Sequence, residues 1–193
     1  MKTFLVCSNH KKFPEPKFFT WNLIADSGVS NTGKPFFMPE ENVSVSLCPL
    51  LKVSRLGKSI AKKFSHRYYD EIAPAVHFQL DSLLETLKKE NLPADKAVSF
   101  DKCLFCDDFI TVDTFINEGY PYELWINGEL KEAWNVSDCR SDFDSVIANV
   151  SEYDTIKIGD LIVPAPSPRL EIRINDRIEI KRDDKLCFSI KIK

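Results

Sequence analysis

Two cysteines separated by two residues, Cys103 and Cys106, have the spacing of redox dithiols and of half a zinc site. The sequence offers no second ligand pair, and this pair does not open a helix after a strand, as a thioredoxin-type motif would. We therefore interpret both residues as small side chains of a loop or strand edge. The remaining cysteines are scattered along a chain long enough to build its own core, so we expect free thiols at all six positions, the other four being Cys7, Cys48, Cys139 and Cys187.

Two histidines, either of which could in principle act as an acid or a base, lie outside any recognisable catalytic motif. His10 lies in a polar N-terminal stretch, where we expect a surface loop. His66 precedes a strand-like segment, and we expect it at the end of a helix. Neither position predicts a catalytic role.

Composition and charge limit the class of protein. The chain has 193 residues, 44% of them hydrophobic, which is enough for one core, so we expect a single domain over residues 1–193. Its net charge is −3 and it has no basic block, which argues against nucleic acid as a partner. Its longest apolar runs, such as 161–163, are too short to cross a membrane or direct export, which predicts a cytoplasmic protein.

Alternating and helical patterns predict the elements in the first half of the chain. Residues 43–48 alternate between apolar and polar, as in a half-buried strand, and residues 50–53 could extend that strand past an edge or bulge at Pro49. Ser82 and Glu85 have the spacing of a capping box. They predict a helix with its leucines on one face, ending near Asn91.

Sequence patterns predict mostly strands in the second half of the chain. Asn127-Gly128 favours a tight hairpin turn between strands at 122–126 and 129–134, because both residues tolerate a positive φ. A short helix is expected over 143–150, and the tail from Arg169 to Lys193 alternates as further strands. Many short strands with a few helices predict a β-rich α+β domain.

Several short segments, in the same order along the chain, resemble the fumarylacetoacetate hydrolase family of metal-dependent enzymes, which act on 2-oxo and 1,3-dicarbonyl acids. The resemblance implies a mixed, rolled β-sheet with a few short helices, which commonly forms homodimers, and an N-terminal lid shortened to about residues 10–16. The matching segments are 1–9, 33–39, 52–60, 67–72, 125–129, 135–138 and 155–162.

The same resemblance implies that the metal-binding carboxylates of the family are missing. Family members hold magnesium or manganese with a Glu-x-Glu pair on one strand and an Asp on a neighbouring strand. Here Ser46 and Cys48 fall at the Glu positions and His77 at the Asp position. Without carboxylate charge a hard dication gains little for its lost hydration, so we expect no bound magnesium or manganese.

Other working parts of the family are also replaced, as far as the resemblance assigns them. The family's lysine corresponds to Val98, an arginine to Asp81, and the catalytic histidine of the lid to Phe13. A loop that grips the substrate carboxylate corresponds to Pro164, Ala165, Pro166 and Ser167, in which the prolines lack amide donors.

Two alternatives retain chemistry at these positions. Cys48 and His77, with Ser46, could hold zinc in place of magnesium, although one thiol and one imidazole are an incomplete ligand set. Cys48 and His77 could also act as a nucleophilic pair, although the sequence supplies no third group to orient the ring.

We expect a catalytically inactive or impaired member of the family that acts as a binding or structural module. The expected partners are a second copy or a related protein, in a dimer, and a small carboxylate ligand. The alternative is an active hydrolase, isomerase or decarboxylase on a small 2-oxo or 1,3-dicarbonyl acid, working through a rearranged site.

Overall fold

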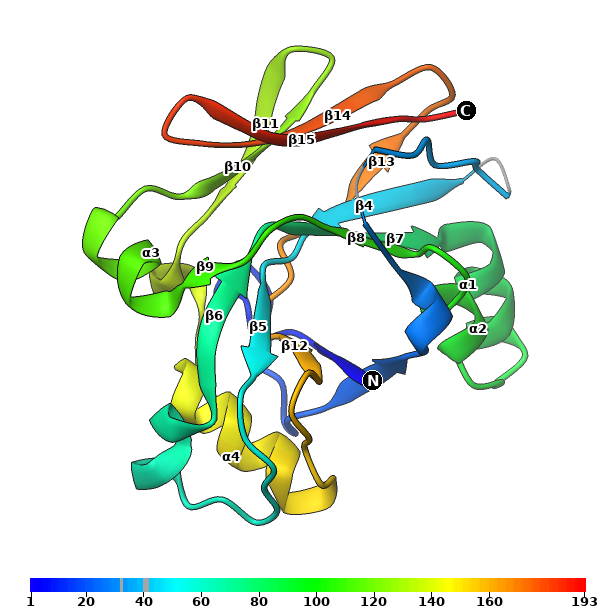
Figure 1. Ribbon diagram of the computed structural model, residues 1–193. Helices are drawn as coiled ribbons and strands as arrows, with labels where there is room; N and C mark the ends of the chain where they lie inside the picture. The colour runs from blue at the N-terminus through cyan, green and yellow to red at the C-terminus, as the bar shows by residue number, and fades with distance from the viewer. Residues whose placement is uncertain (32, 40–41) are drawn as a thin grey trace.

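The computed structural model describes residues 1–31, 33–39 and 42–193, whose strands form three sheets (Figure 1). The four-stranded sheet lies at one end of the molecule, the five-stranded sheet lies next to it, and the six-stranded sheet extends away from both (Figure 1). The short helices pack around the margins of these sheets. The predicted β-rich α+β class is confirmed.

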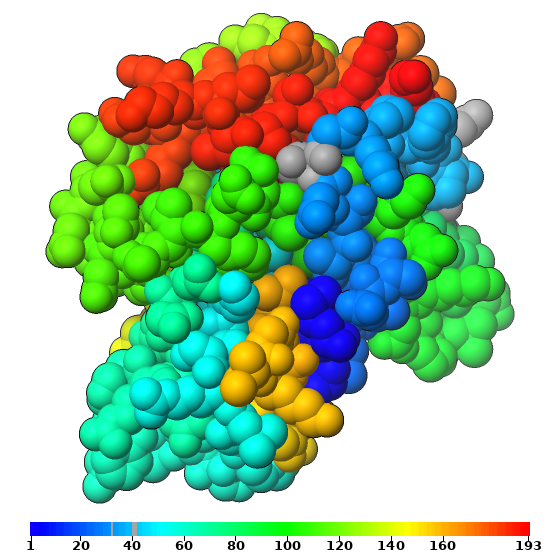
Figure 2. Space-filling view, viewed as in Figure 1, coloured from blue at the N-terminus to red at the C-terminus, as the bar shows by residue number. Residues whose placement is uncertain are grey.

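The six-stranded sheet joins strands from distant parts of the chain. β1 runs parallel to β12, and the other neighbouring pairs are antiparallel. Figure 2 shows the orange segment that leads into β12 between the blue N-terminal and the cyan segments. In sheet order the strands are β2 (Trp21–Ile24), β1 (Thr3–Val6), β12 (Leu161–Val163), β5 (Leu50–Val53), β6 (Tyr69–Ala73) and β9 (Ile110–Thr111).

The five-stranded sheet contains the predicted strand at 43–48 and carries part of an aromatic cluster. Phe78, on the central strand of this sheet, stacks on Phe36 with 3.9 Å between ring centroids, and Phe105 meets Phe78 edge to face. The contacts among these buried rings hold the sheet against residues 33–39, which include Phe36. In sheet order the strands are β13 (Leu170–Ile172), β4 (Val43–Leu47), β7 (Ala75–Leu80), β8 (Leu104–Cys106) and β3 (Val29–Asn31).

The four-stranded sheet confirms the predicted hairpin and the predicted strands of the tail. Asn127 and Gly128 have φ values of 53° and 82°, as the tight turn requires. Asn175, Asp183 and Asp184 also have positive φ and mark the turns of the tail. In sheet order the strands are β11 (Glu129–Trp134), β10 (Tyr122–Ile126), β14 (Arg177–Arg182) and β15 (Lys185–Lys191).

The helices are short. The helix predicted over 143–150 is confirmed as α4 (Phe143–Tyr153), which Asp142 caps by accepting a hydrogen bond from the Ser145 amide. No helix in the described ranges is long and apolar enough to cross a membrane. The others are α1 (Asp81–Lys89), α2 (Asp95–Val98) and α3 (Val112–Glu118), with 3₁₀ turns η1 (Asp26–Gly28), η2 (Lys62–Arg67) and η3 (Val136–Asp138).

The start of α1 differs from the prediction. The helix begins at Asp81, its N-cap residue is Leu80, and no side chain caps it, so the expected capping box from Ser82 is wrong. The Asp81 amide donates to the Asn42 carbonyl oxygen, which precedes β4. A contact between distant segments therefore sets the start of the helix, and the local motif does not.

The expectation at Pro49 is wrong as well. β4 ends at Leu47, and β5 belongs to a different sheet, so residues 50–53 do not extend the first strand. Pro49 lacks the amide hydrogen that a continuing ladder would need. Cys48 and Pro49 are the short link over which the chain passes from the five-stranded to the six-stranded sheet.

Candidate functional site

A cavity of about 500 Å³ opens where the two larger sheets meet α1 and α2. Its wall is mixed, with apolar side chains, hydroxyl and amide groups and two cationic side chains. Four of the positions expected in a degenerate pocket line it, namely Ser46, Val98, Pro166 and Ser167, together with Phe13. The remaining lining residues are Leu5, Val6, Cys7, Ser8, Asn22, Gln79, Leu84, Lys88, Ala94 and Arg169.

Ser46 and His77 face each other across the β4–β7 ladder. The antiparallel register pairs the two residues directly, so their side chains emerge on the same face of the sheet. Ser46 is 1% exposed, and its hydroxyl has no hydrogen-bond partner among the described residues. The adjacency expected from the resemblance is therefore present in the sheet, with an unsatisfied hydroxyl beside the cavity.

Both ring nitrogens of His77 are occupied. Nε2 lies 2.7 Å from the Val98 carbonyl oxygen, and Nδ1 lies 2.9 Å from Nη2 of Arg169. A carbonyl only accepts and a guanidinium only donates, so the hydrogen is on Nε2 and Nδ1 carries a free electron pair. Burial, and then the positive charge of Arg169, lower the pKa of His77 to about 3. The ring is therefore neutral at physiological pH.

Arg169 is the functional residue that sequence reasoning missed. It precedes β13, donates to His77 Nδ1 and lies 3.5 Å from the His77 carbonyl oxygen through Nη1. Burial lowers the pKa of its guanidinium to about 10, so it keeps its charge at neutral pH. No ion pair of the described residues includes Arg169. In the sequence it reads as the first residue of an alternating strand, and nothing there signals its contact with His77.

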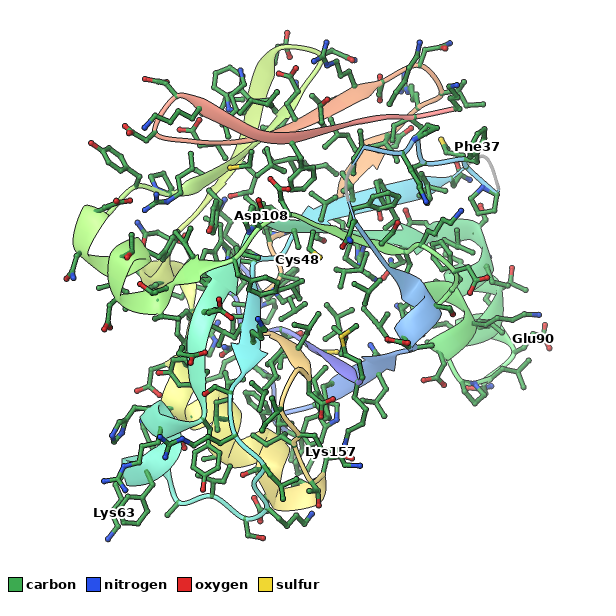
Figure 3. The ribbon with its side chains drawn as sticks, viewed as in Figure 1. Phe37, Cys48, Lys63, Glu90, Asp108 and Lys157 are labelled. Atoms are coloured by element: carbon green, nitrogen blue, oxygen red, sulfur yellow. The ribbon has the colours of Figure 1, made fainter. Side chains whose placement is uncertain are left out.

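Cys48 does not reach the cavity. It lies in the interior of the molecule (Figure 3) and is fully buried. It belongs to a core cluster with Leu50, Ala75 and Leu104. Burial raises the pKa of its thiol well above the ordinary value. The group is therefore a protonated packing residue, which removes the basis for a Cys48–His77 nucleophilic pair.

Cys103 and Cys106 belong to the same small core cluster as Cys48. Cys106 ends β8, and Cys103 directly precedes that strand, which agrees with their interpretation as strand-edge residues. Burial raises the pKa of each thiol to about 11. All six cysteines are free thiols in the structure.

The segment 164–167 is held by hydrogen bonds from three separate elements. The Asn9 side chain donates to the Pro164 carbonyl at 2.9 Å, and Trp134 Nε1 donates to the Ala165 carbonyl at 2.7 Å. The Ser167 hydroxyl accepts from the Leu47 amide at 3.0 Å and donates to the Pro168 carbonyl. This segment is thus a fixed wall of the cavity, with its polar groups already engaged.

Asp81 lines a neighbouring hollow instead of the main cavity. Its carboxylate accepts hydrogen bonds from Ser44 Oγ at 3.0 Å and Gln79 Nε2 at 2.7 Å. Arg169 lines both hollows. The Asp81 charge favours the charged form of Arg169 without forming an ion pair with it.

The expected surface position of His10 is wrong. His10 is fully buried and forms an isolated bridge with Cys139, and its Nδ1 accepts from the Lys12 amide at 3.2 Å. The segment folds back on η3, where the Lys11 amide donates to the Asp138 carbonyl. Phe13, two residues after Lys11, then lies in the cavity wall. His66 lies exposed in the last turn of η2, as predicted.

The side chains present do not fit a hard divalent cation. Within the described ranges no group of three or more His, Cys, Asp or Glu side chains could hold a metal ion. Of the three positions assigned to metal ligands, Ser46 is a neutral hydroxyl, Cys48 is a buried thiol, and both nitrogens of His77 are engaged. The adjacent guanidinium of Arg169 would also repel a cation.

Comparisons of the sequence give distant relatives over nearly the whole chain. The chain is 26% identical over 184 residues to the mitochondrial oxaloacetate tautomerase FAHD1 of Mus musculus, covering 93% of this chain and 81% of the relative. It is 26% identical over 167 residues to the homoprotocatechuate catabolism bifunctional isomerase/decarboxylase of Escherichia coli, covering 86% of this chain and 38% of the relative. No family model matches the sequence.

Comparisons of the structure show the fold. A fumarylacetoacetate hydrolase family protein from Yersinia pestis superposes with a TM-score of 0.89 at 19% identity, covering all of this chain and 93% of the other. The fumarylpyruvate hydrolase from Pseudomonas aeruginosa, solved with Mn²⁺ and pyruvate, gives a TM-score of 0.85 at 13% identity and covers 100% of this chain and 89% of the other. The rolled-sheet fold expected from the sequence is confirmed.

Proposed function

Because the chain belongs to the fumarylacetoacetate hydrolase family, we propose that it is a member that binds a ligand, or serves a structural role, without the family's metal-dependent catalysis. Membership rests on relatives that share about a quarter of their residues over nearly the full chain. The loss of catalysis is inferred from the chemistry of the cavity.

The observation that carries this proposal is the contact between His77 and Arg169. His77 stands where the resemblance places a metal-binding aspartate, and its free electron pair accepts a hydrogen bond from Nη2 of Arg169 at 2.9 Å. If the Arg169 guanidinium left this contact, the buried Nδ1 of His77 and the buried guanidinium would both lose a hydrogen bond. Such a loss costs free energy. The arrangement therefore supports a site in which an organic cation stands beside the position of the family's metal ion.

Three further positions support the absence of turnover. Val98 contributes an aliphatic side chain to the cavity where the family has a lysine, and Phe13 lines it where the lid would supply a histidine. Pro166 offers no amide hydrogen to an anion. General acid–base catalysis needs a group that exchanges a proton near working pH, and the neutral, engaged ring of His77 is unsuited to that role.

Metal content and turnover test the proposal. Purified protein is expected to contain less than about 0.1 equivalents of magnesium, manganese or zinc by mass spectrometry, because the ligand positions lack carboxylates. Added Mn²⁺ or Mg²⁺ should leave Tm within about 1 °C, since a ligand that does not bind the folded state cannot stabilise it. Oxaloacetate tautomerisation should stay at the background rate, with the mouse tautomerase as its positive control. Acylpyruvate cleavage should stay at the background rate as well.

The opposite result would favour the alternative function. Stoichiometric divalent metal together with metal-dependent turnover of a 2-oxo or 1,3-dicarbonyl acid would mean an active hydrolase, isomerase or decarboxylase with rearranged groups. Stoichiometric zinc that is lost in a Cys48→Ser variant would support the zinc site instead.

The assembly and location remain predictions. A homodimer, or a dimer with a related protein, is the expected assembly, and light scattering coupled to size-exclusion chromatography would measure it. The expected location is the cytoplasm, which imaging of the tagged protein would test.

A further inference from the structure

The cavity carries positive charge without a matching carboxylate. Arg169 and Lys88 line it, and among the described residues no Asp or Glu does. Asp81, the carboxylate that acts on Arg169, faces the neighbouring hollow and accepts hydrogen bonds from Ser44 and Gln79. The Arg169 guanidinium forms no ion pair with the described residues, and a bidentate carboxylate is the anion that best fits its planar donors.

An unsatisfied hydroxyl lies in the same wall. Ser46 Oγ is buried and has no hydrogen-bond partner among the described residues. Ser46 pairs in register with His77, the residue that holds the Arg169 guanidinium. A buried hydroxyl is normally satisfied, so an unpaired one on a cavity wall indicates a polar group of a ligand. The serine and the arginine are thus two independent signals for one anionic group.

The rest of the wall limits the shape of that ligand. Leu5, Val6, Phe13 and Leu84 line the cavity with apolar surface, which suits a short carbon chain. Lys88 also lines it, from the last turn of α1, where its side chain is exposed to solvent. One end of a ligand can therefore meet the partly buried arginine while the other meets the exposed lysine.

We infer that this cavity binds a small dicarboxylate without a metal ion, with one carboxylate on Arg169 and Ser46 and the other on Lys88. The inference rests on the proposed function, to which it adds the class of ligand and the residues that recognise it. His77 holds the guanidinium through Nδ1, which can only accept from Arg169 because Nε2 donates to the Val98 carbonyl.

A guanidinium and a metal ion select ligands differently. A metal ion gains from a 2-oxo acid because the oxo group and the carboxylate can both coordinate it, whereas a guanidinium binds the two oxygens of one carboxylate. This cavity should therefore be indifferent to a 2-oxo group. Succinate is expected to bind within about threefold of oxaloacetate, and oxalate, whose two carboxylates are joined directly, should bind more weakly than succinate.

Calorimetric titration of the full chain in excess EDTA tests the inference. Succinate should bind saturably and raise Tm, and butyrate, a monocarboxylate of the same chain length, should bind about tenfold more weakly through loss of the Lys88 contact. Sulfate at the same concentration should not compete, since it presents a single anionic group and the proposed ligand presents two. Sulfate competition at equal strength would overturn the assignment of a dicarboxylate.

Matched variants locate the two contacts. Arg169→Gln should weaken succinate binding at least about tenfold, while Arg173→Gln, on an exposed side chain four residues later, should not. Lys88→Gln should weaken succinate but not butyrate, and Lys89→Gln, also exposed on α1, should change neither. Ser46→Ala should weaken both ligands. Lys88 is exposed, so its variant keeps the test valid if the Arg169 variant does not fold.

The outcomes separate this inference from the proposed function. Unchanged succinate binding in Arg169→Gln, or no saturable dicarboxylate binding by a metal-free wild type, would overturn the inference and leave the loss of catalysis standing. Binding that appears only after Mn²⁺ is added would overturn the proposed function as well. Binding in EDTA that depends on Arg169 and Lys88 would support both.

Discussion

His77 is the residue on which the electrostatics of the cavity depend. The resemblance placed it on a strand next to the one that carries Ser46, and the β-ladder pairs the two residues directly. Its partner Arg169 lies 92 residues away in sequence, so no local pattern could predict the contact. The sequence thus predicted the strand position of His77. The contact between His77 and Arg169 depends on the complete fold.

Acid should destabilise the protein through His77. The unfolded chain binds a proton on this histidine near pH 6.5, and the folded protein does so only near pH 3. Unfolding is therefore increasingly favoured as pH falls through this interval, by at most about 1.4 kcal/mol per pH unit. His77→Gln should reduce that slope by the contribution of this ring, because glutamine can accept from Arg169 and donate to Val98 without titrating. Burial also lowers the pKa of His10, which keeps its own contribution. Urea unfolding at pH 7.5, 6 and 5 measures the slope.

His66→Gln is the matched control for this prediction. His66 is exposed on η2, so its replacement should leave the pH dependence of the wild type in place. Parallel slopes for the His77 variant and the wild type would contradict the role assigned to the buried ring.

At the level of elements, sequence patterns correctly predicted those helices, strands and turns that depend on residues close together in the chain. The turn at 127–128, the helix α4 and the strands of the tail follow from residues that are close in sequence. The start of α1 and the change of sheet at Pro49 follow from distant contacts, and both expectations were wrong. The burial of His10 has the same origin, since η3 lies more than a hundred residues later.

The hairpin turn gives a test at this level. Gly128 has a φ of 82°, and an added Cβ would meet nothing within 4 Å, so Gly128→Ala changes only the backbone preference. Because a left-handed conformation is strained for alanine, the variant should lose about 1–2 kcal/mol of unfolding free energy. Denaturant unfolding of Lys131→Ala, exposed on the same hairpin, should stay within about 0.5 kcal/mol of wild type. Equal stability of both variants would rule out the turn strain.

On the scale of the whole molecule, Trp134 joins two layers. It ends β11 in the four-stranded sheet, is fully buried, and donates from Nε1 to the Ala165 carbonyl beside the cavity. The sequence shows a tryptophan on a predicted strand but gives no sign of which distant carbonyl it meets. This hydrogen bond therefore couples the four-stranded sheet to the segment 164–167 at the cavity wall.

Trp134→Phe should destabilise the protein by about 2–4 kcal/mol, because it leaves a buried carbonyl unpaired and opens a space in the core. Trp125→Phe is the matched control. Trp125 is half-buried and donates to the Glu123 carboxylate, so its loss should cost less than about 1 kcal/mol. Thermal and denaturant unfolding measure both, and a smaller loss at position 134 than at 125 would refute the coupling.

The parallel pairing of β1 with β12 has a consequence for biosynthesis. Leu161 registers with Thr3, and the Lys2 amide donates to the Asp160 carboxylate 158 residues later. While the chain emerges from the ribosome, β1 can pair with β2, but the other edge of β1 stays unpaired until β12 has been made. An open edge can pair with other nascent chains, and such late, long-range closure is slow. Cells that make this protein quickly would therefore benefit from a chaperone that shields that edge during translation.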